Sequence, residues 1–378
     1  MRLTCQQEVP MNLSRSAVVL FVLAGAGAMF HAHSAPSPAT AGSVAPGAPM
    51  LEPRSGHSAT LLLNGKVLIA GGMRRNQDFY RSAELFDPTT GKFQATGEMN
   101  LARVGQAAVL LRSGKVLIVG GWVGHGGTAS AELYDPGTGK FSVLGKMTSR
   151  RGRPSATLLN NGDVLIAGGA DHDTPGGIAS AEVFHADTLK FEAVGPMHSA
   201  RIAQTATLLR DGRVLVAGGR GDSVTASAEL YDPKTKQFVP TGSLLVARYK
   251  HTAGLLPDGR VLIAGGSDER DWSGSLSSAE TYDPKTGRFT AAASLNDSRF
   301  KLPDLAEQIG SGELLVAGGS KRIEVYDPHS GKFLVASGQL DEAWHYMTET
   351  RLEDGRVLLT GGYPNNDRAT AETWIYRP

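Results

Sequence analysis

The chain has 378 residues, a formal net charge of +1 and no tract of basic residues, so a nucleic acid or an anionic membrane surface is not favoured as its partner. Its single cysteine, Cys5, excludes a disulfide framework. The length allows one large domain or two domains of ordinary size.

The N-terminal segment is typical of a secretion signal. Ala17 to Phe30 is an apolar run of 14 residues that follows Arg15, and it is too short for a membrane span. We predict a signal peptide over residues 1–34, with translation starting at Met11, and a linker over residues 35–42. An uncleaved anchor is the alternative. After cleavage the protein is secreted or periplasmic, lacks cysteine and has no membrane attachment.

A short stretch that begins at Asn64, NGKVLIAGG, recurs in variant form along the whole chain. Successive copies are 43 to 53 residues apart, which is the period of propeller blades rather than of helical solenoids. Each copy ends in a glycine doublet, at Gly71-Gly72, Gly120-Gly121, Gly168-Gly169, Gly218-Gly219, Gly265-Gly266, Gly318-Gly319 and Gly361-Gly362. A residue that recurs in every copy is most simply structural, so function is to be sought where the copies differ.

Each copy predicts four antiparallel strands, which in the first repeat are Ser58–Leu63, Lys66–Ala70, Ser82–Phe86 and Lys92–Thr96. Asn64-Gly65 is a two-residue hairpin signal between the first two strands. The second strand is apolar on both faces, as expected when neighbouring sheets cover both. Such sheets bury their faces only by stacking around an axis.

The two ends of this region complement each other. The seventh repeat stops after a third strand at Ala371–Pro378, and an unassigned strand is predicted at Ser43–Met50. We expect the N-terminal strand to pair on the outside of the seventh sheet and close the ring. The fold class is therefore all-β, a single seven-bladed propeller over residues 43–378 with four antiparallel strands per blade.

With the doublets, two aromatic columns make the repeats resemble Kelch repeats over residues 41–378. The first column is Phe86, Tyr134, Phe184, Tyr231, Tyr282, Tyr326 and Trp374, and the second is Phe93, Phe141, Phe191, Phe238, Phe289 and Phe333. The phenylalanines of the second column make the chain similar to exported bacterial Kelch-type proteins, in which this residue is common at that position. The resemblance implies a propeller of the kind found in protein-binding scaffolds, in the catalytic domain of galactose oxidase and in a sialic acid mutarotase. Galactose oxidase chemistry requires a Cys–Tyr crosslink beside copper, which the mature chain cannot form, so no cofactor is expected.

Two charged columns recur and are predicted to form structural ion pairs beside the doublets. The basic column is Arg54, Arg103, Arg151, Arg201 and Arg248, with Arg299 or Lys301 in the sixth repeat. The acidic column is Glu84, Glu132, Glu182, Glu229, Glu280, Glu324 and Glu372.

The loops beside the doublets differ most between repeats and are the predicted binding face. Aromatic rings next to polar groups suit a sugar or peptide ligand, because the ring stacks while the polar groups give direction. The candidate ligand-binding residues are Trp122, His125, His172, Trp272, Trp344, Tyr346 and Tyr363.

One cluster is a weak candidate for acid–base catalysis, namely His345, Glu349 and Arg248. Asp171 and Asp173 flank His172, but adjacent residues rarely converge on one ion, so no metal site is predicted.

The sequence therefore favours an exported, monomeric binding module for an extracellular glycan or protein, held on the rim that carries the doublets. The alternative is a metal-free carbohydrate-active enzyme at the same rim, similar to the sialic acid mutarotase.

Overall fold

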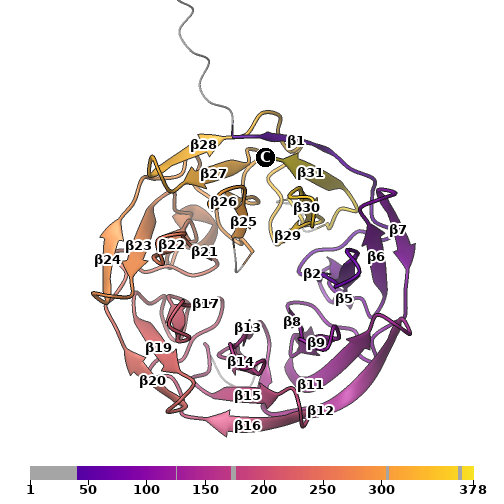
Figure 1. Ribbon diagram of the computed structural model, residues 1–378, viewed down its shortest axis with the longest axis horizontal. Coiled ribbons are helices and arrows are strands. Elements are labelled where there is room, and N and C mark those ends of the chain that lie inside the picture. Colours follow the sequence, from indigo (N-terminus) through magenta and orange to yellow (C-terminus); the bar gives the residue numbers. More distant parts are fainter. Residues whose placement is uncertain (1–40, 125, 172–175, 304–305, 365–367) are drawn as a thin grey trace, which may run out of the picture. The chain divides into compact units, whose positions relative to one another are not determined.

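The computed structural model describes residues 41–378 except residues 125, 172–175, 304–305 and 365–367. Seven antiparallel sheets surround a common axis, which confirms the predicted all-β propeller (Figure 1). The predicted signal peptide and most of the linker lie outside the described residues. Within the described part, no helix is long and apolar enough to cross a membrane.

Every blade has four strands, which are ordered from the innermost strand at the axis to the outermost strand at the periphery. The innermost strands are β2 (Ser58–Leu61), β8 (Ala107–Leu110), β13 (Ser155–Leu158), β17 (Thr205–Leu208), β21 (Thr252–Leu255), β25 (Glu307–Ile309) and β29 (Thr348–Arg351). The second strands are β3 (Val67–Ala70), β9 (Val116–Val119), β14 (Val164–Ala167), β18 (Val214–Ala217), β22 (Val261–Ala264), β26 (Glu313–Val316) and β30 (Val357–Thr360). The second strands are almost wholly buried, as their apolar sequences predict, and they form the core between blades.

The outer strands complete each sheet. The third strands are β6 (Ala83–Asp87), β11 (Gly126–Asp135), β15 (Ala181–His185), β19 (Ala228–Asp232), β23 (Ala279–Asp283), β27 (Glu324–Asp327) and β31 (Thr373–Arg377). The outermost strands are β7 (Lys92–Ala95), β12 (Lys140–Arg151), β16 (Lys190–Val194), β20 (Gln237–Pro240), β24 (Arg288–Ala291), β28 (Lys332–Val335) and, in the seventh blade, β1 (Ser43–Pro46). The doublet loops add β4 (Met73–Arg75), β5 (Asp78–Phe79), β10 (Trp122–Val123) and the 3-10 turn η1 (Asp271–Gly274).

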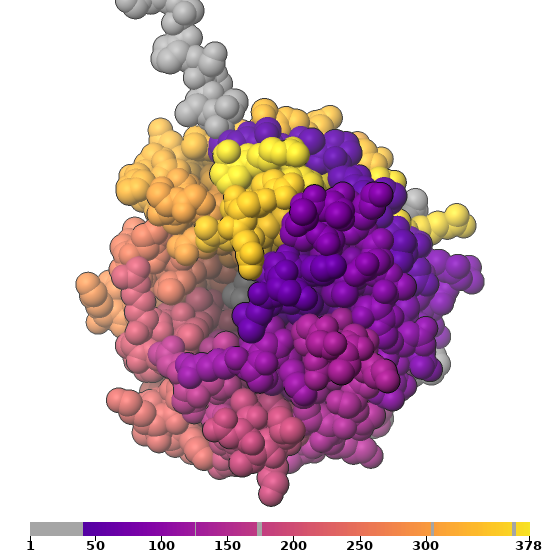
Figure 2. All heavy atoms as spheres, turned by 45° about the vertical axis from the view of Figure 1, so that its right-hand side comes forward, coloured from indigo at the N-terminus to yellow at the C-terminus, as the bar shows by residue number. Residues whose placement is uncertain are grey.

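The N-terminal strand closes the ring as predicted. The seventh sheet has the order β1-β31-β30-β29, with Ser43 opposite Arg377 and Pro46 opposite Trp374. The indigo N-terminal strand lies against the yellow C-terminal residues at this edge (Figures 1 and 2). The strand is shorter than predicted because proline lacks the N–H needed to continue the ladder. The chain nevertheless stays attached, since the Met50 amide donates to the Ala371 carbonyl at 2.8 Å.

In six blades a buried arginine binds a glutamate of the third strand and the doublet of the same blade. In the second blade, Arg103 Nη2 lies 2.7 Å from Glu132 Oε1, and its Nη1 donates to the Gly120 carbonyl at 2.8 Å. The same glutamate accepts the Leu101 amide of the incoming connection. We call this arrangement the arginine clasp. It is formed by Arg54–Glu84, Arg103–Glu132, Arg151–Glu182, Arg201–Glu229, Arg248–Glu280 and Arg299–Glu324.

The clasp also connects neighbouring blades through its backbone. The second glycine of each doublet donates its N–H to the carbonyl of the next blade's clasp residue, at 2.8–3.0 Å. Around the ring these bonds are Gly72–Arg103, Gly121–Arg151, Gly169–Arg201, Gly219–Arg248, Gly266–Arg299, Gly319–Trp344 and Gly362–Arg54. A Cβ at Gly71 would lie 2.8 Å from the Arg103 carbonyl oxygen, so the doublets permit a close approach of two backbones.

In the seventh blade the predicted alignment of the third strand with the other repeats is wrong by two residues. Trp374, opposite Leu359, stands where Glu84 stands opposite Ile69, so the charged column does not continue at Glu372. Glu372 is exposed and takes no part in a clasp. Tyr376, rather than Trp374, continues the aromatic column, since it pairs with Val357 as Phe86 pairs with Val67.

Two tryptophans replace the ion pair in that blade. Trp344 occupies the clasp position and packs against Trp374, with ring centroids 5.9 Å apart. Its indole N–H donates to Asp341 Oδ1 at 3.0 Å, which satisfies the buried donor. Trp344, predicted to bind ligand, is therefore a buried structural residue.

Arg103→Ala should lower the free energy of unfolding by about 3–5 kcal/mol, because it leaves Glu132 buried without its counter-ion. Denaturant unfolding measures the change. Arg81→Ala is the control, since Arg81 and Glu98 form a surface pair with side chains 58% and 54% exposed, and such pairs contribute at most about 1 kcal/mol. Equal stability of the Arg103→Ala and Arg81→Ala chains would contradict a structural role for the clasp.

A chain that starts at Leu51 should unfold at a lower temperature than one that starts at Ala41. Removal of β1 uncovers the edge of β31 and opens the seventh sheet. Scanning calorimetry of the two chains tests this, and identical unfolding temperatures would show that β1 does not stabilise the ring.

Candidate functional site

Seven equivalent residues encircle the axis on the doublet rim. Each follows the clasp residue by two positions, and each has a left-handed φ of 49° to 64°. We call them the mouth ring: Gly56, Gly105, Arg153, Ala203, Lys250, Lys301 and Tyr346. Neighbouring members hydrogen-bond through their backbones, as in the donation from Tyr346 to the Lys301 carbonyl at 2.9 Å and from Gly56 to the Tyr346 carbonyl at 3.0 Å. The mouth ring therefore holds its side chains at fixed places around the axis.

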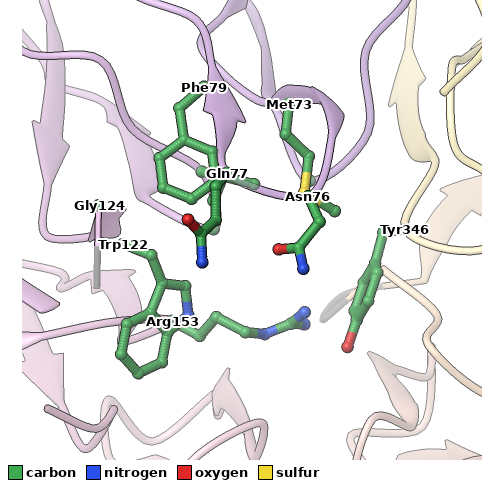
Figure 3. Close-up of a pocket in the computed structure, with 11 residues that line it drawn as sticks. Met73, Asn76, Gln77, Phe79, Trp122, Gly124, Arg153 and Tyr346 are labelled. Atoms are coloured by element: carbon green, nitrogen blue, oxygen red, sulfur yellow. The ribbon is translucent and has the colours of Figure 1, made fainter. Parts of the chain in front are cut away.

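A cavity of about 320 Å³ opens beside the mouth ring, between the first two blades (Figure 3). Its lining combines two mouth-ring side chains with loop residues, namely Arg153 and Tyr346 with Met73, Asn76, Gln77, Phe79 and Trp122. The amides of Asn76 and Gln77 point toward Arg153 across the space (Figure 3). The Arg153 guanidinium carbon lies 4.2 Å from the centroid of the Tyr346 ring. The cavity thus offers flat apolar surface together with directional polar groups.

A second cavity, of about 280 Å³, lies in the axial channel and shares Arg153 and Tyr346 with the first. Glu307 and Glu349 both line it. Glu349 Oε1 accepts the Ala317 amide at 2.7 Å, and its Oε2 is buried without a partner among the described residues.

The two channel carboxyls have raised pKa values. Burial raises the pKa of Glu349 to about 8, and the nearby carboxylate of Glu307 adds to the increase. Burial also raises the pKa of Glu307 to about 7. Glu349 therefore carries a proton at neutral pH and can donate it.

Two lysines of the mouth ring lie among aromatic side chains. Lys301 Nζ is 3.6 Å from the centroid of Trp272 and donates to the Tyr363 hydroxyl at 2.9 Å. Lys250 Nζ is 2.6 Å from Asp271 Oδ1. Although burial opposes it, hydrogen bonds from Lys250 and from a tyrosine lower the pKa of Asp271 below its usual value, so the carboxylate stays charged.

The predicted ligand-binding residues fall into separate places. Trp122 and Tyr346 line the first cavity, whereas Trp272 and Tyr363 surround Lys301. His125 and His172 lie outside the described residues. Trp344 is in the seventh blade's tryptophan pair, as described above.

The predicted acid–base cluster does not come together as one group. Arg248 forms the clasp of the fifth blade with Glu280, 2.8 Å away. His345 is buried next to Trp272, with Nδ1 3.3 Å from the Phe300 carbonyl oxygen. Of the three, only Glu349 lines the channel cavity.

Sequence reasoning missed Arg153, Lys250 and Glu307, and it named Lys301 only as the alternative to Arg299 in the basic column. Three of these occupy the mouth-ring position, and a usable signal was present in the glycines at that position in the first two repeats, Gly56 and Gly105. A column that holds glycine in some repeats is consistent with a left-handed backbone at that position.

The described residues contain no group of three or more His, Cys, Asp or Glu side chains that could hold a metal ion. The galactose oxidase copper site requires a cysteine crosslinked to a tyrosine, and residues 41–378 contain no cysteine. The side chains present do not fit that cofactor.

Comparison with known proteins agrees with the architecture. The Kelch motif model matches residues 53–100, 103–148 and 248–296. No curated protein matches the chain. Among solved structures, a fungal alcohol oxidase of the AA5 family in complex with copper superposes with a TM-score of 0.71 at 16% identity, over 89% of this chain and 76% of that one. At this identity the likeness shows the fold alone. The chain is thus a seven-bladed β-propeller with Kelch motifs, similar in fold to a fungal alcohol oxidase.

Proposed function

We propose that the protein is a secreted or periplasmic glycan-binding module, and that its ligand occupies the cavity beside the mouth ring. The observation that carries the proposal is the lining of this cavity, in which Trp122 and Phe79 stand next to the amides of Asn76 and Gln77. Aromatic faces stack on the C–H face of a sugar, and amides pair with its hydroxyls.

The shape of the site supports a glycan over a protein partner. The cavity of about 320 Å³ is concave and has the size of small-molecule sites, whereas protein interfaces bury broad surfaces. A binding module on a monomeric propeller needs no cofactor. The predicted export would bring it into contact with extracellular glycans.

Phe79→Ala and Asn76→Ala should each weaken glycan binding by about tenfold or more, because they remove a stacking face or a hydrogen-bonding amide. A glycan array, followed by calorimetry on the bound glycans, measures this. Leu63→Ala is the control, since Leu63 is 70% exposed in a hairpin outside the cavity.

Binding that is unchanged in both cavity variants would place the ligand elsewhere. If no glycan on the array binds, the proposal is wrong and a protein partner becomes the alternative.

A second candidate function, a metal-free carbohydrate-active enzyme of the mutarotase type, is favoured by the channel carboxyls. Mutarotation needs an acid that protonates the ring oxygen and a base that takes the proton of the anomeric hydroxyl. The ring then opens to the carbonyl form and closes again with the proton transfers reversed. Protonated Glu349 and the more acidic Glu307 could supply these roles next to the sugar cavity.

This candidate requires Glu349 to be protonated at neutral pH, which stability measurements test. Its folded pKa of about 8 lies above the ordinary value of 4.5, so the folded chain binds a proton that the unfolded chain releases. The resulting stability is present at pH 4.5 and is lost as the pH rises to 8. Glu349→Gln should therefore reduce the decline in unfolding free energy between pH 5 and 8, by on the order of 2–4 kcal/mol.

The exposed Glu98→Gln variant is the control and should keep the parent profile. Anomer-exchange NMR with galactose, galacturonate and N-acetylneuraminate then tests the chemistry. Glu349→Gln should slow enzyme-dependent exchange by about a hundredfold. Loss of exchange only in His345→Ala would assign the proton transfer to the imidazole and contradict the role of Glu349.

A further inference from the structure

The first cavity and the channel cavity meet along one side of the mouth ring. Four consecutive members of the ring line both cavities, namely Tyr346, Gly56, Gly105 and Arg153. We call these residues the shared arc. Their backbones are joined, since Gly105 donates to the Gly56 carbonyl at 2.8 Å and Arg153 donates to the Gly105 carbonyl at 3.0 Å. The shared arc is therefore a fixed boundary between the two cavities.

The middle of the shared arc carries no side chains. A Cβ at Gly105 would lie 2.8 Å from Arg153 Cγ, and a Cβ at Gly56 would lie 2.8 Å from Val104 Cγ2. Both distances are shorter than a carbon–carbon contact of about 3.5–4.0 Å. The left-handed backbone alone does not require glycine, because Ala203 adopts it at the equivalent ring position with a φ of 54°. The two glycines thus keep space open where the cavities adjoin.

The size and arrangement of the cavities favour a long ligand over a short one. Their volumes of about 320 and 280 Å³ each lie near the lower end of the range for small-molecule sites, about 300–1,000 Å³. Because the cavities share a boundary, one ligand can fill both if it is narrow where it crosses the shared arc. Linked sugar rings have this shape, since each bulky ring is joined to the next by a single bridging oxygen.

The channel cavity also has polar groups suited to a second sugar ring. Its lining includes His57, Gln106 and Glu349. In the described part of the chain, His57 Nδ1, Gln106 Oε1 and Glu349 Oε2 are each buried without a hydrogen-bond partner. The opposite ends of two of these side chains are fixed, because His57 Nε2 lies 2.9 Å from the Thr360 hydroxyl and Gln106 donates to the Ala70 carbonyl at 2.7 Å. Buried polar groups in folded proteins are nearly always hydrogen-bonded, and the hydroxyl groups of a sugar would complete this set.

We propose that the ligand is an oligosaccharide of at least two linked rings, which lies across the shared arc with one ring in each cavity. The first ring stacks on the aromatic lining that Phe79 and Trp122 provide. The linkage passes over Gly56 and Gly105, and the second ring directs its hydroxyl groups to the polar lining of the channel cavity. The inference rests on the proposed glycan-binding function and adds the length of the ligand.

Calorimetry with sugars of different chain length tests this inference. The probes are N-acetylglucosamine against chitobiose, mannose against mannobiose and glucose against cellobiose, together with the terminal monosaccharide and disaccharide of each glycan that binds on the array. In every pair that binds, we expect the disaccharide to bind about tenfold or more tightly than the monosaccharide, because the second ring gains contacts in the channel cavity. If the monosaccharide binds as tightly as its disaccharide, the inference is wrong.

Two substitutions should affect the second ring specifically. Gly105→Ala adds a methyl group where the cavities meet, and Ala156→Leu fills part of the channel cavity, which Ala156 lines without lining the first. Each should weaken binding of the disaccharide by about tenfold, to the affinity of the monosaccharide. Ala156→Leu should leave the affinity for the monosaccharide unchanged. Scanning calorimetry shows whether each chain is folded.

Gly91→Ala is the matched control for the backbone strain of Gly105→Ala. Gly91 has a φ of 68°, close to the 64° of Gly105, and a Cβ there would meet nothing within 4 Å. Gly91→Ala should therefore impose a similar strain and leave binding of both sugars unchanged.

The outcomes distinguish this inference from the proposal on which it depends. Equal affinity for both chain lengths, with loss of binding in Phe79→Ala, would keep the glycan site and overturn the two-ring ligand. Folded Gly105→Ala and Ala156→Leu chains that still prefer the disaccharide would also overturn it. Absence of binding to every sugar would overturn both proposals. The chain-length comparison uses the unsubstituted protein, so it decides the question even if a variant fails to fold.

Discussion

The fold and the site both depend on the buried arginine that stands at the start of six of the seven blades. A buried guanidinium must be neutralised and hydrogen-bonded, and for Arg103 the Glu132 carboxylate, the doublet carbonyl and Ser130 provide this at both Nη atoms, while Nε has no partner among the described residues. Its own carbonyl then receives the Gly72 amide from the preceding blade. The same residue therefore fixes the interior of one blade and its distance from the next. Each mouth-ring residue follows the clasp position by two residues, so the clasp fixes where the mouth-ring residues lie.

This dependence explains why the seventh blade can lose its ion pair and remain in the ring. Trp344 keeps the backbone bond to Gly319 even though its side chain has exchanged charge for apolar packing against Trp374. Replacing both members of a buried ion pair by apolar groups avoids the desolvation of two charges. The backbone bond is thus the constant feature of the ring, and the side chains above it vary from blade to blade.

The sequence predicted the architecture because the glycine doublets, hairpin signals and apolar strands recur in register. It failed where a repeat departs from that register. Glu372 matched the glutamate column by pattern, yet the ladder of the seventh sheet places Trp374 there. In the site, Trp122 and Tyr346 were found as departures from the repeat. Lys250 and Lys301 were not, since their position at the mouth depends on a left-handed backbone that single residues do not reveal.

The two candidate functions are connected by the positions of the charged groups along the axis. Cations lie at the mouth, and two carboxyls with raised pKa values lie in the channel cavity. Arg153 and Tyr346 line both cavities, so a saccharide anchored at the mouth would be held next to the channel carboxyls. The proposed binding and the proposed catalysis would therefore share Arg153 and Tyr346, and a substitution at either residue should affect both.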